Sequence, residues 1–222
     1  MTEPATAITD FLMAVLAGWF ALDLGRRAGR RVDAVWWSRA FALLAFGALT
    51  GGAYHGFRAS LTVWAAGALW RVSLATAMLA SFATMRAAAA QWLPAAQWLP
   101  EARQVAWSWI AALKLAVFLI AGAVEPVFLA VVIDFGLTML FVSGAAIAGR
   151  HRNQRACVAV TAGATLFAVG ALVQQGGVSP GPSFNHNDLF HVIQILGNGC
   201  FFVSARLGAV IQSGPLRGFH AP

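Results

Sequence analysis

The chain has 222 residues, of which 59% are hydrophobic and only 10% are charged. Soluble domains carry about 25% charged residues, so this composition excludes an ordinary soluble globular protein and indicates an all-α integral membrane protein. The net charge of +7 does not predict nucleic-acid binding, because the arginines gather at the ends of apolar segments, where they orient a protein in a membrane.

Seven apolar segments are long enough to cross a bilayer, which requires about 20 residues each. These runs are long and do not alternate, and only helices or closed barrels satisfy the backbone in lipid, so the segments are predicted to be helices. The start of the chain lacks the basic region of a signal peptide, so the first span is expected to stay in the protein. We predict a single seven-transmembrane helix bundle over residues 1–222, with spans at 7–25, 35–57, 61–85, 104–124, 126–148, 156–175 and 188–212.

The arginines predict the direction of the chain. Most of them follow the first, third and fifth spans, whereas the opposite connections carry Arg58 together with Glu3, Glu125 and Asp188. The positive-inside rule then gives an outside N-terminus and a cytoplasmic C-terminus. We expect the chain in a bacterial cytoplasmic (inner) membrane, in contact with membrane lipids; its oligomeric state is left open.

Two further features are predicted for the inner side. The hexapeptide Ala-Ala-Gln-Trp-Leu-Pro occurs at 89–94 and again at 95–100, and proline ends each copy, so an interfacial loop or a short surface helix is predicted there. Six tryptophans lie near the predicted inner boundary and are interpreted as an aromatic belt: Trp36, Trp37, Trp92, Trp98, Trp107 and Trp109.

The last span opens with an unusually polar stretch, residues 184–198. Asp188, or Asn187 beside it, can cap the helix. His191, Gln194 and Asn198 follow at steps of three and four residues, which places them on one helical face. Polar groups in lipid cost several kcal/mol each, roughly, unless they find partners, so this face must meet protein or water.

Several ionisable side chains share one predicted level of the membrane. His55 lies near the outer end of the second span, on the face of Gly47 and Gly51, and therefore points toward another helix. His186 and His191 lie near the outer start of the last span, at the level of Glu125 and Asp10.

This layer predicts a zinc site. His55, His186 and His191 would be the ligands, and Asp188 a fourth ligand or an acceptor that orients a histidine. A water activated by the metal could attack an ester or amide carbonyl. Two alternatives stay open: a structural or proton-handling polar cluster, and haem held by His55 and His191 as paired axial ligands.

Three further charges are predicted deeper in the bilayer. Lys114 and Asp134 lie at similar distances from the turn at Glu125, on neighbouring antiparallel helices, and Arg71 reaches a similar depth. An ion pair of Asp134 with Lys114 or with Arg71 is one interpretation, and a path for protons or ions through the same residues is the other.

The histidine motifs resemble those of the seven-span hydrolase superfamily that includes alkaline ceramidases and the progestin/adiponectin receptors. Members place a serine four residues before a histidine at the end of helix two, an aspartate on helix three, and two histidines four apart on helix seven, in a zinc-binding site. His55 in Gly-Gly-Ala-Tyr-His matches the histidine of helix two, and His191 in Asn-Asp-Leu-Phe-His matches the second histidine of helix seven.

The chain departs from this pattern at three places. Gly51 stands at the serine position, Asn187 stands where the first histidine of helix seven belongs, and the third span has no carboxylate. The resemblance implies that His186 or Asp188 replaces the missing ligand if zinc binds.

Three functions follow as hypotheses. The first is a zinc-dependent membrane hydrolase that acts on a lipid-like amide or ester. The alternative is a non-catalytic membrane sensor or a small-solute or proton transporter that uses the polar face of the last helix, with Arg71, Lys114 and Asp134 as its gate. A scaffold subunit stays open as a third, because glycine-rich helix faces also serve assembly.

Overall fold

The computed structural model describes residues 3–93 and 101–212, without the side chains of 101–104 and 209–212. Within this part the chain forms seven α-helices, and each of them contains a stretch long and apolar enough to cross a membrane. The prediction of seven long apolar helices is therefore confirmed. Their bounds are α1 Pro4–Arg27, α2 Val32–Phe57, α3 Val63–Trp92, α4 Glu101–Val124, α5 Phe128–Ala148, α6 Gln154–Gln175 and α7 His186–Gln212.

The helix bounds differ most from the prediction at the end of α3. This helix continues to Trp92, whereas the predicted span ends at residue 85. The extension is rich in alanine, the strongest helix former, so it prolongs the helix beyond the last clearly membrane-like residue. The first copy of the repeated hexapeptide therefore begins inside α3, and its second copy, 95–100, lies outside the described residues.

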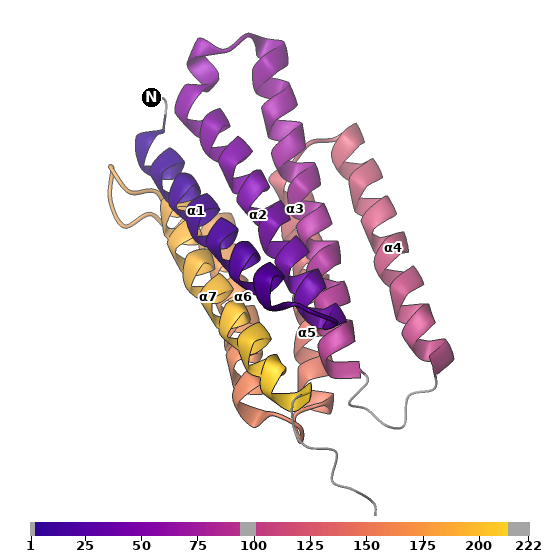
Figure 1. Ribbon diagram of the computed structural model, residues 1–222. Helices are drawn as coiled ribbons and strands as arrows, with labels where there is room; N and C mark the ends of the chain where they lie inside the picture. Colours follow the sequence, from indigo (N-terminus) through magenta and orange to yellow (C-terminus); the bar gives the residue numbers. More distant parts are fainter. Residues whose placement is uncertain (1–2, 94–100, 213–222) are drawn as a thin grey trace, which may run out of the picture.

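Six of the helices form a ring. In the order α1, α2, α3, α5, α6 and α7 each helix packs against the next, and α7 returns to α1. Helix α4 lies outside the ring, against α3 and α5 (Figure 1). Consecutive helices run antiparallel, so α1, α3, α5 and α7 begin at one end of the bundle, where the N-terminus lies (Figure 1). We call this end the site end and the opposite one the far end.

The far end of the ring is filled by side chains. Large residues from α2, α3, α6 and α7 meet there, and the core includes Trp37, Phe41, Trp92, Val160 and Phe201. On α6 and α7 two glycines allow a close approach, since a Cβ at Gly163 would lie 3.0 Å from the carbonyl oxygen of Gly197. This half of the bundle is solid, and it fixes the geometry of the helices that continue toward the site end.

The tryptophan prediction is wrong for two residues. Trp37 and Trp92 are each only 1% exposed and belong to the core, not to an interfacial belt. Trp37 can be buried because its indole Nε1 donates a hydrogen bond of 2.7 Å to Gln91 Oε1. Trp109, by contrast, is 72% exposed, as an interfacial position requires. Trp98 lies outside the described residues.

Candidate functional site

A cavity of about 620 Å³ lies inside the ring, toward the site end. Most of its polar lining comes from α1, α2, α3 and α7, and α5 and α6 add Ser143, Thr165 and Gln174. Most of the remaining lining is apolar and comes from α2, α3, α5 and α6. Polar residues that line it are Asp10, His55, Ser73, His186, His191 and Gln194. The two histidines that the sequence singles out on α2 and α7 therefore line one hollow, together with the predicted residues His186, Asn187 and Gln194.

His191 is buried, and its hydrogen bonds indicate which ring nitrogen carries the proton. The ring Nδ1 lies 3.0 Å from the hydroxyl oxygen of Thr9. The Thr9 hydroxyl donates to carbonyl oxygens of its own helix, those of Ala5 and Thr6. Because that proton serves these carbonyls, we assign Nδ1 as the donor to Thr9, which leaves the lone pair of a neutral ring on Nε2.

The Nε2 atom of His191 faces a buried carboxylate. It lies 3.4 Å from Oδ1 of Asp10, whose side chain is only about 5% exposed. The other oxygen, Oδ2, has no hydrogen-bond partner among the described residues. A lone pair on Nε2 and an ionised carboxylate are both acceptors, so they repel at this distance unless a proton or a cation lies with them. The pair is chemically incomplete without one.

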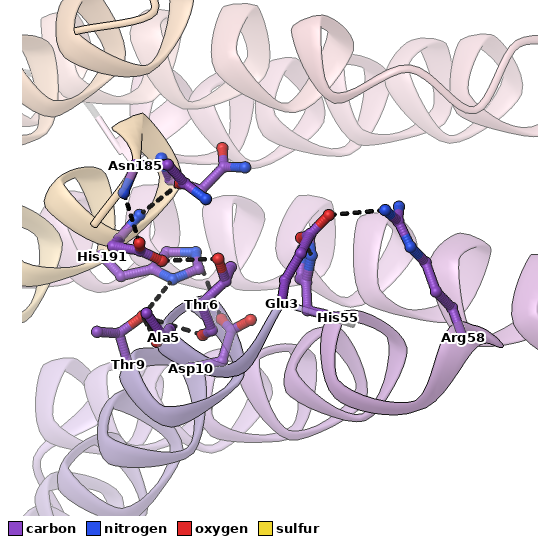
Figure 2. A network of polar contacts seen from close by, with 11 residues as sticks. Glu3, Ala5, Thr6, Thr9, Asp10, His55, Arg58, Asn185 and His191 are labelled. Atoms are coloured by element: carbon purple, nitrogen blue, oxygen red, sulfur yellow. Dashed lines mark hydrogen bonds and ion pairs between the residues drawn. The ribbon is translucent and has the colours of Figure 1, made fainter. Parts of the chain in front are cut away.

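His55 of α2 is also oriented through its Nδ1 atom, by a residue at the start of α1. Its Nδ1 lies 2.5 Å from Glu3 Oε2, and Arg58 donates to the other oxygen of Glu3 at 2.7 Å. The backbone N–H of Glu3 donates to the carbonyl of His55, which fastens the start of α1 to the end of α2. Figure 2 shows the Glu3–His55–Arg58 group beside the Asp10–His191 group. A carboxylate on Nδ1 leaves Nε2 of His55 available to a ligand.

Two glycines of α2 make room for Asp10. A Cβ at Gly52 would lie 3.0 Å from the Asp10 Cβ and 3.0 Å from the Phe11 ring, so a larger residue would push α1 away. A Cβ at Gly51 would lie 3.2 Å from the Ser73 hydroxyl and 3.5 Å from Asp10 Oδ2. The space at the expected serine position is thus shared by a serine of α3 and a carboxylate of α1.

The start of α7 corrects the predicted cap. Asn185, not Asp188 or Asn187, precedes the helix, and its Oδ1 accepts from the backbone N–H of Asn187 at 2.7 Å and of Asp188 at 3.3 Å. Asp188 reaches back to accept from the Asn185 N–H at 2.6 Å, which completes a reciprocal capping box. Its other oxygen accepts from Thr6 Oγ1 at 2.6 Å, so Asp188 ties α7 to α1 and is not among the cavity-lining residues.

Two more predicted polar residues lie away from the cavity. Asn198 is buried, but it borders a separate small cavity of about 10 Å³ deeper in the bundle, and its Nδ2 has no partner among the described residues. Glu125 is exposed in the connection between α4 and α5 and does not belong to the polar core, in contrast to the prediction. A residue in a short connection projects outward even when its depth matches that of the site.

The deep charges form one ion pair. Lys114 of α4 binds Asp134 of α5, and its Nζ also donates to Ser81 of α3 at 3.0 Å. Arg71 is exposed on α3, so the prediction that it belongs to the polar core is wrong. Counting residues places Arg71 and Lys114 at one depth, but only packing decides which of them turns inward. Neither Lys114 nor Asp134 is among the cavity-lining residues.

The sequence prediction missed four contributors to this site. The sequence predicts the right level for Asp10 but does not place it among the site residues, Glu3 serves in that prediction only to orient the chain, and Thr9 and Ser73 are not singled out. A carboxylate inside an apolar span is itself a signal, because such residues usually serve a function. Thr6, Thr9 and Asp10 share one face of α1, and this pattern could have pointed to Asp10.

The described residues contain no group of three or more His, Cys, Asp or Glu side chains that is already arranged to hold a metal ion. The cavity is lined by two imidazoles whose Nδ1 atoms are held by other side chains, and by the buried carboxylate of Asp10, which has a free oxygen. Nitrogen and carboxylate donors of this kind suit zinc.

A family model described as "Family of unknown function (DUF6962)" matches residues 5–210. The match covers nearly the whole chain, so the chain belongs to this family. Neither the curated proteins nor the solved structures gave a match. The likeness to the seven-span hydrolases stays a prediction.

Proposed function

We propose that this member of the DUF6962 family is a zinc-dependent membrane hydrolase that acts on a lipid-like amide or ester. The observation that carries the proposal is the buried contact of 3.4 Å between His191 Nε2 and Asp10 Oδ1, with Asp10 Oδ2 left without a partner. A cation held by both groups would remove the repulsion and satisfy the free oxygen at once.

His191, His55 and Asp10 would hold the metal. His186, predicted as the third ligand, lines the same cavity from the first turn of α7, and Asp10 takes its place because it already faces His191. Thr9 and Glu3 would orient the two rings through Nδ1, as second partners of histidine ligands commonly do. Because the three groups are not yet gathered, binding would draw α1, α2 and α7 together at the site end.

The cavity supports a lipid-like substrate. Most of its polar side chains lie toward the site end with Asp10, His55 and His191, and Ser143 and Thr165 lie farther along α5 and α6. Residues such as Val131, Phe135, Met139 and Phe167 line it with apolar surface. A molecule with a polar carbonyl group and a hydrocarbon chain matches this division. Zinc with two histidines and a carboxylate supplies an activated water for attack on a carbonyl. Gln194 and Ser73 are positioned to hold polar atoms of the substrate at that end.

A second candidate is a sensor that binds the same kind of molecule without chemistry. The lack of a ready three-ligand group among the described residues favours it. Transport of protons or ions is less well supported, because the Lys114–Asp134 pair does not continue the polar lining of the cavity.

Zinc content of the purified protein tests the proposal. We expect about one zinc per chain in the wild type, and loss of zinc in Asp10→Asn and in His191→Ala. His151→Ala is the matched control, because His151 is exposed in the connection between α5 and α6. Equal zinc in Asp10→Asn and wild type, or none in the wild type after zinc is added, would overturn the metal site.

Hydrolysis is measured on the same preparations with long-chain amides and esters that release a fluorescent product. We expect product from the wild type and none after a chelator or in His191→Ala. Binding of these compounds without product, with or without chelator, would favour the sensor.

A further inference from the structure

The cavity opens sideways between two helices. Among the described residues that line it, four are exposed on the outside of the bundle, and all four belong to α5 or α6: Gly136, Leu140, Thr165 and Ala168. Gly136 and Leu140 lie one turn apart on α5, and Thr165 and Ala168 one turn apart on α6. The lining residues at the site end, such as His55, Trp70 and His186, are half-buried.

Three of the four residues at the opening are small, and the opening is closed toward the far end of the bundle. At Gly136 a Cβ would meet no described atom within 4 Å, so the space beside α5 is empty there. Toward the far end α5 and α6 close on each other, and Val142 and Val160 are both 0% exposed. The opening between α5 and α6 therefore does not run the whole length of the two helices. We call it the α5–α6 window, and Gly136, Leu140, Thr165 and Ala168 border it.

The window faces the surface that meets hydrocarbon if the bundle lies in a membrane. Leu140 is 74% exposed, and its neighbours on the outer faces of α5 and α6 are apolar: Ile133, Leu137, Val169 and Leu172. Among the described residues at the opening, the one polar side chain is Thr165, whose hydroxyl donates to the Thr161 carbonyl of its own helix, so the surface around the opening suits a lipid chain better than water. Along α5 the lining runs from Phe128 to Ser143, which at about 1.5 Å per residue allows an extended chain of roughly 20 Å.

We propose that the α5–α6 window is the route by which the hydrocarbon chain of a membrane lipid enters the cavity. The polar group of the lipid would reach Asp10, His55 and His191 from inside the bilayer, and the remainder of the molecule could stay outside the ring. This inference rests on the proposed class of ligand, and it requires neither zinc nor hydrolysis.

Photolabelling in liposomes tests the window. The purified protein is reconstituted with a long-chain fatty acid that carries a diazirine near its methyl end, irradiated, and mapped by mass spectrometry. In the wild type we expect labels on cavity-lining segments of α5 and α6. Gly136→Trp fills the window and is expected to lose most of the labelling of inner residues such as Phe135 and Phe167.

Gly144→Trp is the matched control. Gly144 is on the same helix, is exposed, and has no described atom within 4 Å of a Cβ, but it does not line the cavity. This variant should be labelled like the wild type. Ala168→Trp blocks the window from α6, and decides the question if Gly136→Trp does not give a folded protein.

The outcomes separate the two proposals. Inner labelling that is equal in the wild type, Gly136→Trp and Ala168→Trp would overturn the window while leaving a lipid in the cavity. A wild type without inner labels would overturn the lipid-like ligand and the window with it. Zinc content should be unchanged in the tryptophan variants, since their positions lie away from the three proposed ligands.

Discussion

Two buried carboxylates, Asp10 and Asp134, occupy different kinds of surroundings in one bundle. Asp134 is fully buried and binds the ammonium group of Lys114, a donor that matches it. Asp10 faces the lone pair of an imidazole across 3.4 Å and borders a cavity. Each has one oxygen without a partner among the described residues, so burial and an unsatisfied atom do not distinguish them. The distinguishing feature is the group that the other oxygen meets: the ammonium group of Lys114 for Asp134, and the acceptor Nε2 of His191 for Asp10.

If this distinction holds, stability should depend strongly on the partner of Asp134 and only weakly on Asp10. Lys114→Met should give the largest effect, because it leaves a buried carboxylate without its cation. We expect a loss of about 3–5 kcal/mol in stability, seen as a lower unfolding temperature in detergent. The double variant Lys114→Met/Asp134→Leu should recover most of it. If Lys114→Met is as stable as the wild type, the Lys114–Asp134 pair does not stabilise the fold.

The next effect should come from the glycine that admits Asp10. Gly52→Ala places a Cβ 3.0 Å from the Asp10 Cβ, so we expect α1 to shift and stability to fall by about 1–3 kcal/mol. Zinc binding should weaken with it. Gly199→Ala is the control, since a Cβ there meets no described atom within 4 Å, and it should be neutral or slightly stabilising. Equal behaviour of the two alanine variants would contradict the close packing.

A smaller effect is expected at Thr9. Thr9→Val removes the acceptor that holds His191 Nδ1, whereas Thr9→Ser keeps it. Zinc affinity should fall about tenfold in the valine variant, which corresponds to about 1.4 kcal/mol, and the serine variant should retain most of it. Competition titration with a zinc-binding dye measures both. The same affinity in all three proteins would exclude Thr9 as a positioning residue.

The smallest change in stability is expected at Asp10 itself. In Asp10→Asn the amide can donate to His191 Nε2, so the repulsion between two acceptors is relieved without a cation. The metal-free variant should unfold within about 1 kcal/mol of the metal-free wild type, or be slightly more stable. Thermal unfolding after treatment with a chelator is the measurement. A loss as large as that of Lys114→Met would mean that Asp10 is a structural carboxylate like Asp134.

The helices, and the location of His55 and His191 at one level of the bundle, can be predicted from the sequence. Span length and apolar content determine the first, and the spacing of polar residues along α2 and α7 determines the second. The sequence does not predict that Asp10 contacts His191, because the position of Asp10 depends on how closely α1 approaches Gly51 and Gly52. Residue counting gives depth but not the rotation of a helix about its axis, and rotation decided between Lys114 and Arg71.

The link between α1 and α7 also has a consequence for biosynthesis. Asp10, Thr6 and Thr9 are made first, and their partners His191 and Asp188 are made nearly last. A nascent or truncated chain that lacks α7 therefore lacks the Asp10–His191 contact. A ligand that bridges Asp10 and His191 would also hold α1 against α7, where the ring closes. Binding of such a ligand would therefore report that α7 has been made and has packed against α1.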